Sequence, residues 1–276
     1  MIYLVTGSAG FIGSHFCRYI LNNYSDAKVI GLDSLTYAGN MITMRDFIDN
    51  PRYIFYESDI RNKQSLSEIF DKYRIDFLVN FAAESHVDRS INDPGSFLTT
   101  NIIGTQVLLE LSMNYGVQRF HQVSTDEVYG DLPLDNLSKK FSEATPINPS
   151  SPYSVSKASA DLLVNAYFRT YHLPITISRC SNNYGPYQYP EKLIPVMIQK
   201  ALKNELLPVY GTGSNVRDWL YVEDHCIAID LILRNGKIGE TYNIGGATEL
   251  TNLELVNMLL ELLNKSNKLI TFVEDR

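Results

Sequence analysis

Short apolar runs alternate with stretches of helical spacing through the first two-thirds of this chain. Six apolar runs are predicted to be buried strands, at residues 2–5, 28–32, 53–56, 77–81, 119–124 and 175–179. Four stretches with apolar residues every three or four positions are predicted to be helices, at residues 14–24, 63–73, 94–115 and 153–171. Strands joined in this way by helices form right-handed crossovers, so the pattern predicts an α/β fold with a doubly wound parallel sheet.

The pattern changes after residue 179. A loop is expected at 182–187, a helix at 194–203, a last strand at 242–245, and a helix that starts at Thr251 with Glu254 in a capping box. We therefore expect a larger domain from residues 1–180 and about 217–245, and a small discontinuous domain from about 181–216 and 246–276. Residues 131–152 hold four of the eleven prolines and are predicted to be a loop where a substrate enters.

Composition narrows the class of protein. The chain has 276 residues, of which 45% are hydrophobic, enough for a sizeable core. Its net charge of −7 argues against nucleic-acid binding. Three widely spaced cysteines fit neither a metal site nor a disulfide framework. With no signal-peptide pattern, and with an apolar run at 226–233 too short to cross a bilayer, we expect a cytoplasmic protein with no membrane partner.

A glycine-rich turn, residues 6–13, joins the first strand to the first helix. Gly7 permits a tight turn, Gly10 a close backbone approach, and Gly13 close packing of helix on strand, so that the helix N-terminus faces a pyrophosphate. Asp33 ends the second strand. A carboxylate there holds ribose hydroxyls and repels a 2′-phosphate, which favours NAD over NADP. A merely structural turn is the alternative interpretation.

Two further segments carry reactive groups. Tyr153 and Lys157 lie four residues apart, on one face of a helix, where an ammonium would favour the phenolate and make the tyrosine a base. Thr125, Asp126 and Glu127 follow a strand and supply a hydroxyl and two carboxylates. This set suits oxidation of an alcohol followed by elimination of water. The alternatives are a buried structural tyrosine, a solvated lysine, and carboxylates that cap a helix or face solvent.

These motifs resemble those of the extended short-chain dehydrogenase/reductases, and further segments are similar to the nucleotide-sugar 4,6-dehydratases among them. The segments are residues 35–40, 82–90, 125–127, 179–187, 190–195 and 215–219. The resemblance implies a Rossmann sheet that binds NAD as cofactor, and it implies dTDP-glucose as the substrate. It assigns binding of this nucleotide sugar to the smaller domain. By this resemblance, Tyr153 is the base at C4 of the sugar, Glu127 is the base at C5 and Asp126 is the acid at C6. Thr125 is implied to bond the reacting hydroxyl, and Lys157 the ribose of the nicotinamide.

The resemblance also implies binding residues. Those for the cofactor are Gly7, Gly10, Phe11, Ile12, Gly13, Asp33, Ser34, Leu35, Thr36, Asp59, Ile60, Phe81, Ala82, Ala83, Ser85, Thr100, Tyr153, Lys157 and Asn183. Those for the substrate are Ser85, Thr125, Asn182, Lys192, Leu193, Ile194, Pro195, Pro208, Val209, Tyr210, Arg217, Asn252, Asp275 and Arg276. For Asp59 a plain turn and for Arg217 a surface ion pair with Asp218 are the alternatives.

The resemblance implies a homodimer, formed through the helices at 94–115 and 153–171. Residues 41–44 depart from the usual sequence near the adenosine end, and the family continues beyond Asp275 and Arg276 through a substrate-binding loop, so we expect a truncated smaller domain. Two alternatives stay open: a 4,6-dehydratase for UDP-glucose or another nucleotide sugar, and a non-catalytic dinucleotide-sensing protein.

Overall fold

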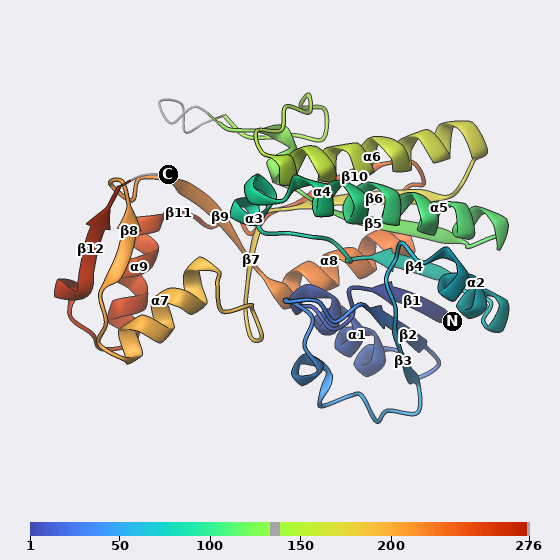
Figure 1. Ribbon diagram of the computed structural model, residues 1–276, viewed down its shortest axis with the longest axis horizontal. Coiled ribbons are helices and arrows are strands. Elements are labelled where there is room, and N and C mark those ends of the chain that lie inside the picture. Colours follow the sequence, from blue (N-terminus) through green and yellow to red (C-terminus); the bar gives the residue numbers. More distant parts are fainter. Residues whose placement is uncertain (133–138, 275–276) are drawn as a thin grey trace. The chain divides into compact units, whose positions relative to one another are not determined.

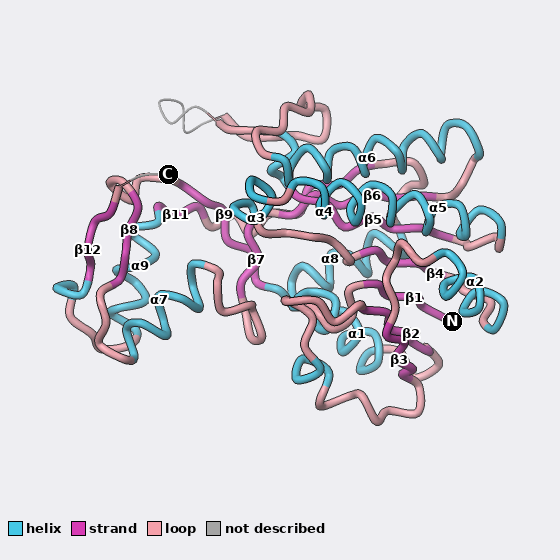
Figure 2. Tube along the Cα trace, in the orientation of Figure 1, coloured by secondary structure: helices cyan, strands magenta, loops and turns pink. Residues whose placement is uncertain are grey.

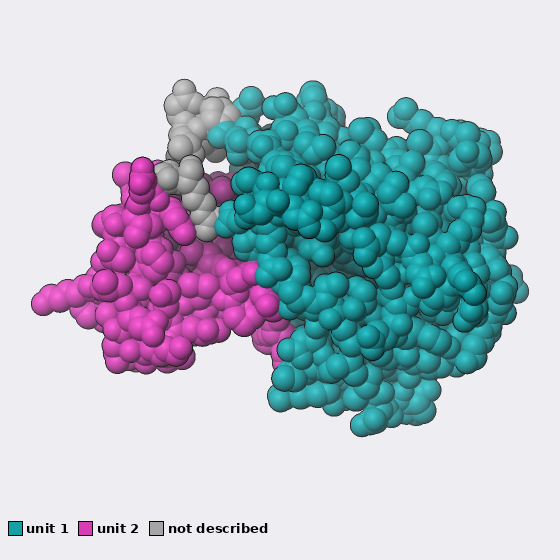
Figure 3. All heavy atoms as spheres, in the orientation of Figure 1, with its two compact units in different colours: residues 1–180, 223–244 teal, residues 181–222, 245–276 magenta. Residues whose placement is uncertain are grey.

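The chain folds into two compact units in a computed structural model that describes residues 1–132 and 139–274. The larger unit comprises Met1–Cys180 and Glu223–Ile244, and the smaller comprises residues 181–222 and 245–276 (Figure 3). The second stretch of the larger unit thus begins at Glu223 and not near residue 217. The strand at 216–221 belongs to the smaller unit because it pairs with strands of that unit.

A seven-stranded sheet of parallel strands forms the centre of the larger unit, in the order β10-β6-β5-β4-β1-β2-β3. The strands are β1 (Ile2–Thr6), β2 (Lys28–Asp33), β3 (Tyr53–Glu57), β4 (Phe77–Asn80), β5 (Arg119–Thr125), β6 (Ile175–Cys180) and β10 (Thr241–Ile244). The chain winds outward from β1 in both directions, so β1 and β4 flank the switch point of a doubly wound sheet. The predicted α/β fold class is confirmed.

Helices cover both faces of this sheet (Figure 1). On one face lie α1 (Phe11–Asn23) and α8 (Val222–Asn235), and on the other α2 (Lys63–Lys72), α5 (Thr105–Asn114) and α6 (Pro152–Tyr171). Alternate side chains of β1 serve the two cores, because Tyr3 and Val5 pack with α1 and α8 whereas Leu4 packs with α2, α5 and α6. A strand that is buried on both faces has apolar residues at nearly every position, and the sequence of β1 has this pattern.

The helix expected at 94–115 is divided into three parts, after a short helix α3 (Val87–Asn92). They are α4 (Pro94–Phe97), a π-helical stretch η2 (Leu98–Gly104) and α5. Within η2, Asn101 is buried and bonds both the N–H and the C=O of Glu84 and the hydroxyl of Ser156. The wider π turn accompanies this inward-facing amide, and the apolar spacing of the segment carries no sign of it.

As far as residue 274, the smaller unit contains two small sheets, two α-helices and the short 3-10 helix η4 (Asn267–Leu269) (Figure 2). One sheet has the order β11-β9-β7, with β7 (Asn182–Tyr184), β9 (Val216–Tyr221) and β11 (Glu249–Thr251), and the other pairs β8 (Leu207–Tyr210) with β12 (Ile270–Val273). Its α-helices are α7 (Leu193–Leu202) and α9 (Asn252–Leu262), whose facing side chains build a separate core. The capping box is confirmed, since Thr251 Oγ1 accepts from Glu254 N at 3.1 Å and Glu254 Oε2 accepts from Thr251 N at 2.8 Å.

A buried ion pair fastens α6 to β6 in the larger unit. Arg179 Nε donates to Asp161 Oδ2 at 2.9 Å, and the two side chains are 5% and 0% exposed. Arg179 Nη1 also donates to the hydroxyl of Tyr129 at 2.9 Å, and that hydroxyl donates to Asn243 Oδ1 at 2.8 Å. Four elements thus meet at one polar cluster inside the unit.

Among the residues that the structure describes, no helix is both long and apolar enough to cross a membrane. Cys17, Cys180 and Cys226 are buried free thiols.

Asp161→Ala should destabilise the protein strongly. The substitution leaves the guanidinium of Arg179 buried without its carboxylate, and loss of one partner of a buried pair costs about 3–5 kcal/mol of the free energy of unfolding. Urea denaturation measures the loss. Lys237→Ala, which removes the exposed ion pair of Lys237 with Glu240, is the control and should leave the unfolding midpoint unchanged. A loss below about 1 kcal/mol for Asp161→Ala would contradict the assignment.

Candidate active site

The carboxyl ends of the parallel strands of the larger unit lie along one edge of its sheet. Most of the sequence-predicted cofactor and catalytic residues follow β1, β2, β3, β4 and β5 at this edge. The order of the strands places β1 between β4 and β2, so the loops after these two strands flank the glycine turn. This is the edge at which doubly wound sheets bind their ligands.

The glycine turn is packed too closely for side chains. A Cβ at Gly13 would lie 2.1 Å from the carbonyl oxygen of Gly7, and a Cβ at Gly7, where φ is +68°, would lie 2.8 Å from the backbone N of Ala82. Helix α1 begins directly after Gly10 without a side-chain cap. Its first turn consists of Phe11 and Ile12, which are half-buried, and Gly13, which is buried. Uncapped N–H groups at a helix N-terminus are suited to a phosphate.

Asp33 is held in place at the end of β2. Its side chain is 8% exposed, Oδ2 accepts from Ala9 N at 3.0 Å, and Oδ1 accepts from Leu35 N at 2.9 Å. Burial raises the pKa of this carboxyl, and the backbone N–H groups oppose that shift. Leu35 has a φ of +48°, a left-handed conformation that turns the loop after Ser34 back toward the glycine turn. The arrangement fits a ribose and excludes a 2′-phosphate by charge.

The loops after β3 and β4 complete the predicted dinucleotide site. Asp59 pairs with Arg61 at 2.6 Å and also accepts from its backbone N, so the turn-forming role is present. Ile60 is buried and lies against Gly104. A Cβ added at Gly104 would clash with Cδ1 of Ile60. The loop after β4 carries Ala82, Ala83 and Ser85, and Phe81 at its start packs against Phe16. Thr100 lies in η2.

Thr125 ends β5 and begins the short helix η3 (Asp126–Tyr129). Its hydroxyl, 8% exposed, accepts from Glu127 N at 3.3 Å and lies 3.4 Å from Asp126 Oδ1. The helix cap is therefore Thr125 and not one of the carboxylates. Asp126 is half-buried and Glu127 is exposed, beside the same hydroxyl.

Tyr153 and Lys157 lie in the first two turns of α6 and are 8% and 4% exposed. A capping box of Ser151 and Ser154 fixes the start of this helix. Lys157 Nζ donates to the carbonyl of Val123 in β5 at 2.7 Å. Because Lys157 is buried and bonded to the strand that carries Thr125, the solvated-lysine alternative is excluded.

The electrostatics of Tyr153 differ from the sequence-based expectation. Burial raises its pKa well above the usual value, and the charges of Glu127, Cys180 and Asp126 raise it further, whereas the Thr125 hydroxyl lowers it. Burial lowers the pKa of Lys157, and Asp161 opposes that shift. With its ammonium engaged by Val123, Lys157 is not among the main influences on the phenol. The polypeptide alone therefore holds Tyr153 protonated at neutral pH.

Sequence reasoning missed three side chains that support this site. Asp161 follows Lys157 by four residues, so helical spacing from the catalytic pair was a signal for it. Arg179, its partner, was noted only as part of a longer segment. Asn101 ties the loop after β4 to α6 through Glu84 and Ser156, and only its place in a π turn explains why it faces inward.

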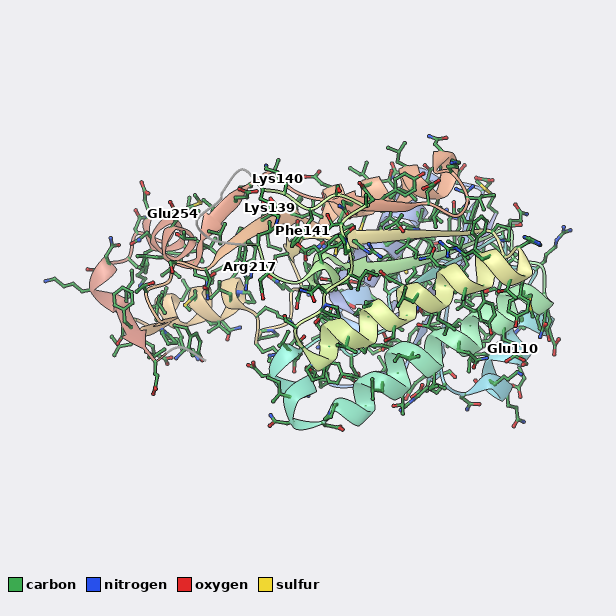
Figure 4. All side chains as sticks on the ribbon, turned by 90° about the horizontal axis from the view of Figure 1, so that it is seen from above. Glu110, Lys139, Lys140, Phe141, Arg217 and Glu254 are labelled. Atoms are coloured by element: carbon green, nitrogen blue, oxygen red, sulfur yellow. The ribbon has the colours of Figure 1, made fainter. Side chains whose placement is uncertain are left out.

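The predicted substrate residues that are described lie in the smaller unit, apart from Ser85 and Thr125. Asn182 and Asn183 are in β7, Lys192 caps α7, residues 193–195 form its first turn, and residues 208–210 are in β8. Arg217 is exposed on β9 (Figure 4). It pairs with Leu250 of β11, and Asn252 N donates to the carbonyl oxygen of Asn215 at 3.0 Å. Asp275 and Arg276 lie outside the described residues.

The alternative of a surface ion pair between Arg217 and Asp218 finds no support in the contacts of Asp218. Its carboxylate accepts from Gly246 N at 2.8 Å and from Thr248 N at 2.7 Å, which fixes the turn before β11. Neighbouring residues of a strand also point to opposite faces.

Comparison with known proteins identifies the family. A family model described as GDP-mannose 4,6 dehydratase matches residues 4–274. The protein Agl12 of Haloferax volcanii, named for low-salt glycan biosynthesis, is 52% identical over 100% of this chain and 87% of its own length. The dTDP-glucose 4,6-dehydratase of Neisseria gonorrhoeae is 52% identical over 99% of this chain and 84% of its own.

A solved structure shows the same likeness in three dimensions. The dTDP-glucose 4,6-dehydratase of Bacillus anthracis in complex with NAD has a TM-score of 0.93 and 50% identity, and the match covers 100% of this chain and 85% of that one. The dinucleotide turn, the buried Tyr153–Lys157 pair and the Asp126–Glu127 pair are thus found in a chain that belongs to the GDP-mannose 4,6 dehydratase family.

Proposed function

We propose that this chain is an NAD-dependent dTDP-glucose 4,6-dehydratase. The observation that carries the proposal is the convergence of Thr125, Tyr153 and Lys157 in a buried cluster, with two carboxylates directly beside it on η3. An oxidation needs only the first three groups. Asp126 and Glu127 add an acid and a base, which an elimination of water requires.

NAD is the cofactor of this reaction. The closely packed glycine turn leads into the first turn of α1, which no side chain caps, and Asp33 suits ribose hydroxyls. A bound NAD⁺ would supply an acceptor for the hydride of C4 and, once reduced, a donor of that hydride to C6. In this proposal the larger unit holds the dinucleotide, and the smaller unit, through Asn182, Lys192, Arg217 and Asn252, holds the nucleotide sugar.

Tyr153, once its own phenol proton has passed to solvent, accepts the proton of the C4 hydroxyl, and Thr125 orients that hydroxyl by a hydrogen bond. Burial holds the pKa of Tyr153 well above its usual value, so positive charge that enters the site favours ionisation of the phenol. Lys157 Nζ, bonded to Val123 O, keeps its other N–H groups for a ribose. Glu127 removes the C5 proton, which the 4-keto group makes acidic, and Asp126 protonates the C6 hydroxyl so that it departs as water. When hydride reaches C6, Glu127 returns its proton to C5.

The substrate assignment is tested by incubation of the purified protein with dTDP-glucose or UDP-glucose and no added NAD⁺. A 4-keto-6-deoxy product from dTDP-glucose, identified by mass spectrometry as a loss of water, supports the proposal. A preference for UDP-glucose would support the alternative dehydratase, and no product from either sugar would favour a non-catalytic dinucleotide-binding protein. A cytoplasmic location remains a prediction from the sequence.

We further propose a homodimer through α6 and the segment that contains η2 and α5. These helices pack against each other, and large apolar side chains stay exposed on them, among them Leu98 at 42%, Ile103 at 52%, Val155 at 42% and Leu162 at 58%. Val155 and Leu162 lie two turns apart on α6 and share one face. Large apolar side chains gathered on one exposed surface are typical of an interface that another protein chain covers.

Glu127→Gln should stop the reaction after oxidation. The amide keeps the shape of the side chain but removes the base, so removal of the C5 proton should slow by roughly 10²- to 10⁴-fold. The variant should accumulate reduced cofactor on the protein, visible as absorbance of the reduced nicotinamide. Tyr153→Phe, the matched control, should show no reduction at all. If Glu127→Gln forms product at the wild-type rate, Glu127 is not the base.

Asp33→Ser should relax the preference for NAD. Without the carboxylate the charge that repels a 2′-phosphate is gone, while a hydroxyl still bonds a ribose. Titration of cofactor-free protein should give a ratio of NADP to NAD dissociation constants at least about tenfold smaller than in the wild type, equivalent to about 1.4 kcal/mol. An unchanged ratio would assign the selectivity to another group.

Leu162→Glu should weaken the dimer, because a charge in an apolar contact loses its water. Sedimentation velocity at micromolar concentration should show a dimer for the wild type and a monomer for the variant. Lys237→Glu, a charge change at an exposed residue after α8, which covers the opposite face of the sheet, is the control and should remain dimeric. A monomeric wild type would contradict the proposal.

A further inference from the structure

The loop after β2 carries a tyrosine at the tip of a fastened turn. Gly39 N donates to Thr36 O at 3.1 Å, which closes the turn that contains Tyr37. The end of the loop is bound to the glycine turn, because Asn40 N donates to Ala9 O at 3.0 Å and Thr43 Oγ1 donates to the same oxygen at 2.9 Å. A Cβ at Gly39 would lie 2.6 Å from Asp33 Oδ1, so the loop also passes closely over the ribose carboxylate.

Tyr37 meets an arginine from the loop and helix that follow β4. The guanidinium carbon of Arg89, in α3, lies 3.6 Å from the centroid of the Tyr37 ring. At this distance the planar guanidinium stacks on the ring face, which is a favourable cation–π contact. Burial raises the pKa of the carboxyl of half-buried Glu84, and the charges of Arg89 and Arg61 oppose that shift. The charge of Arg89 is therefore partly balanced within the protein.

The position of this pair follows from the order of the sheet. Since β1 lies between β2 and β4, a contact between the loops after β2 and β4 spans the carboxyl end of β1, where the glycine turn begins. A cavity of about 350 Å³ opens beside the pair, lined among others by Tyr37, Arg89, Glu84 and Phe97. The ring of Phe97 contacts that of Tyr153, with centroids 6.3 Å apart and planes at 78°. The pair thus forms one wall of a hollow whose other wall touches the catalytic tyrosine.

We propose that the Tyr37–Arg89 stack is a bridge that retains the dinucleotide through each turnover. The inference rests on the proposed function, in which the hydride taken from C4 returns to C6 of the same sugar. A reduced cofactor that left between these steps would strand the oxidised sugar. A bridge across the carboxyl end of β1, between loops fastened on both sides, has to open before a bound dinucleotide exchanges with solvent.

Exchange of NAD tests the bridge without any sugar. The protein is loaded with isotope-labelled NAD and chased with unlabelled NAD, and the label that stays bound is followed in the wild type, Tyr37→Ala, Arg89→Ala and the double variant. Each single variant should exchange about tenfold faster than the wild type, equivalent to about 1.4 kcal/mol. The double variant should exchange no faster than the singles, because the two side chains act as one contact.

Arg234→Ala is the matched control. Its guanidinium carbon stacks 3.7 Å from the Tyr24 ring, but this pair lies after the end of α1, at the amino edge of the sheet. Loss of an equally close stack there should leave NAD exchange unchanged, so a general loss of stability is separated from loss of the bridge. Three results would overturn the proposal. NAD exchange could be unchanged in both single variants, it could be accelerated equally in Arg234→Ala, or the effects of the two substitutions could multiply in the double variant.

A second readout uses the substrate. With dTDP-glucose, the bridge variants should release free NADH and become dependent on added NAD⁺, whereas the wild type needs none. If the wild type makes no 4-keto-6-deoxy sugar but the label exchange still accelerates as described, the proposed function fails and the bridge stands. If the wild type makes the product and exchange is the same in all proteins, the bridge fails alone.

Discussion

The ammonium group of Lys157 is buried, and much of the larger unit is arranged to make that burial tolerable. An ammonium without water needs hydrogen-bond acceptors and negative charge nearby. The carbonyl of Val123 supplies the first, and Asp161, one turn along α6, supplies the second. Asp161 is itself buried and requires Arg179, which in turn bonds Tyr129. One charge at the active site thus dictates a chain of compensating groups that fixes α6 against β5 and β6.

This chain of charges also explains why buried polar contacts hold one side of the candidate active site, whereas the other side lies nearer to solvent. Tyr153 and Lys157 sit on a helix whose position is set by buried polar contacts, whereas Asp126 and Glu127 lie in a short helix nearer to solvent. In the proposed reaction, the step that needs accurate geometry, transfer of a hydride with its proton, is assigned to the side held by buried contacts. The carboxylates are assigned the exchange of protons with the sugar and solvent, and partial exposure suits that role.

The sequence predicted those parts of the fold that depend on local patterns. The strands from β1 to β6, the helices α1, α2 and α6, and the capping box of α9 follow from apolar spacing and cap chemistry. The strands β7, β8, β9, β11 and β12 were not predicted, because they are short and their pairing joins distant segments. The π turn around Asn101 depends on a partner, Glu84, that no local pattern brings near, and helix α8 was considered only as an apolar run. In the site, the motifs located the residues, but the pKa of Tyr153 depends on burial, which spacing does not report.

The high pKa of Tyr153 changes how the proposed reaction is understood. A phenolate created by Lys157 alone would be present before any cofactor, and would compete for protons throughout the cycle. In this chain burial and the neighbouring carboxylates favour the neutral phenol. Once Tyr153 has taken the C4 proton, the same environment keeps that proton in place, so a neutral phenol can donate a hydrogen bond to the 4-keto oxygen. Such a bond draws electrons from the carbonyl and makes the C5 proton more acidic, which is what Glu127 needs. Burial that opposes the first step therefore assists the second.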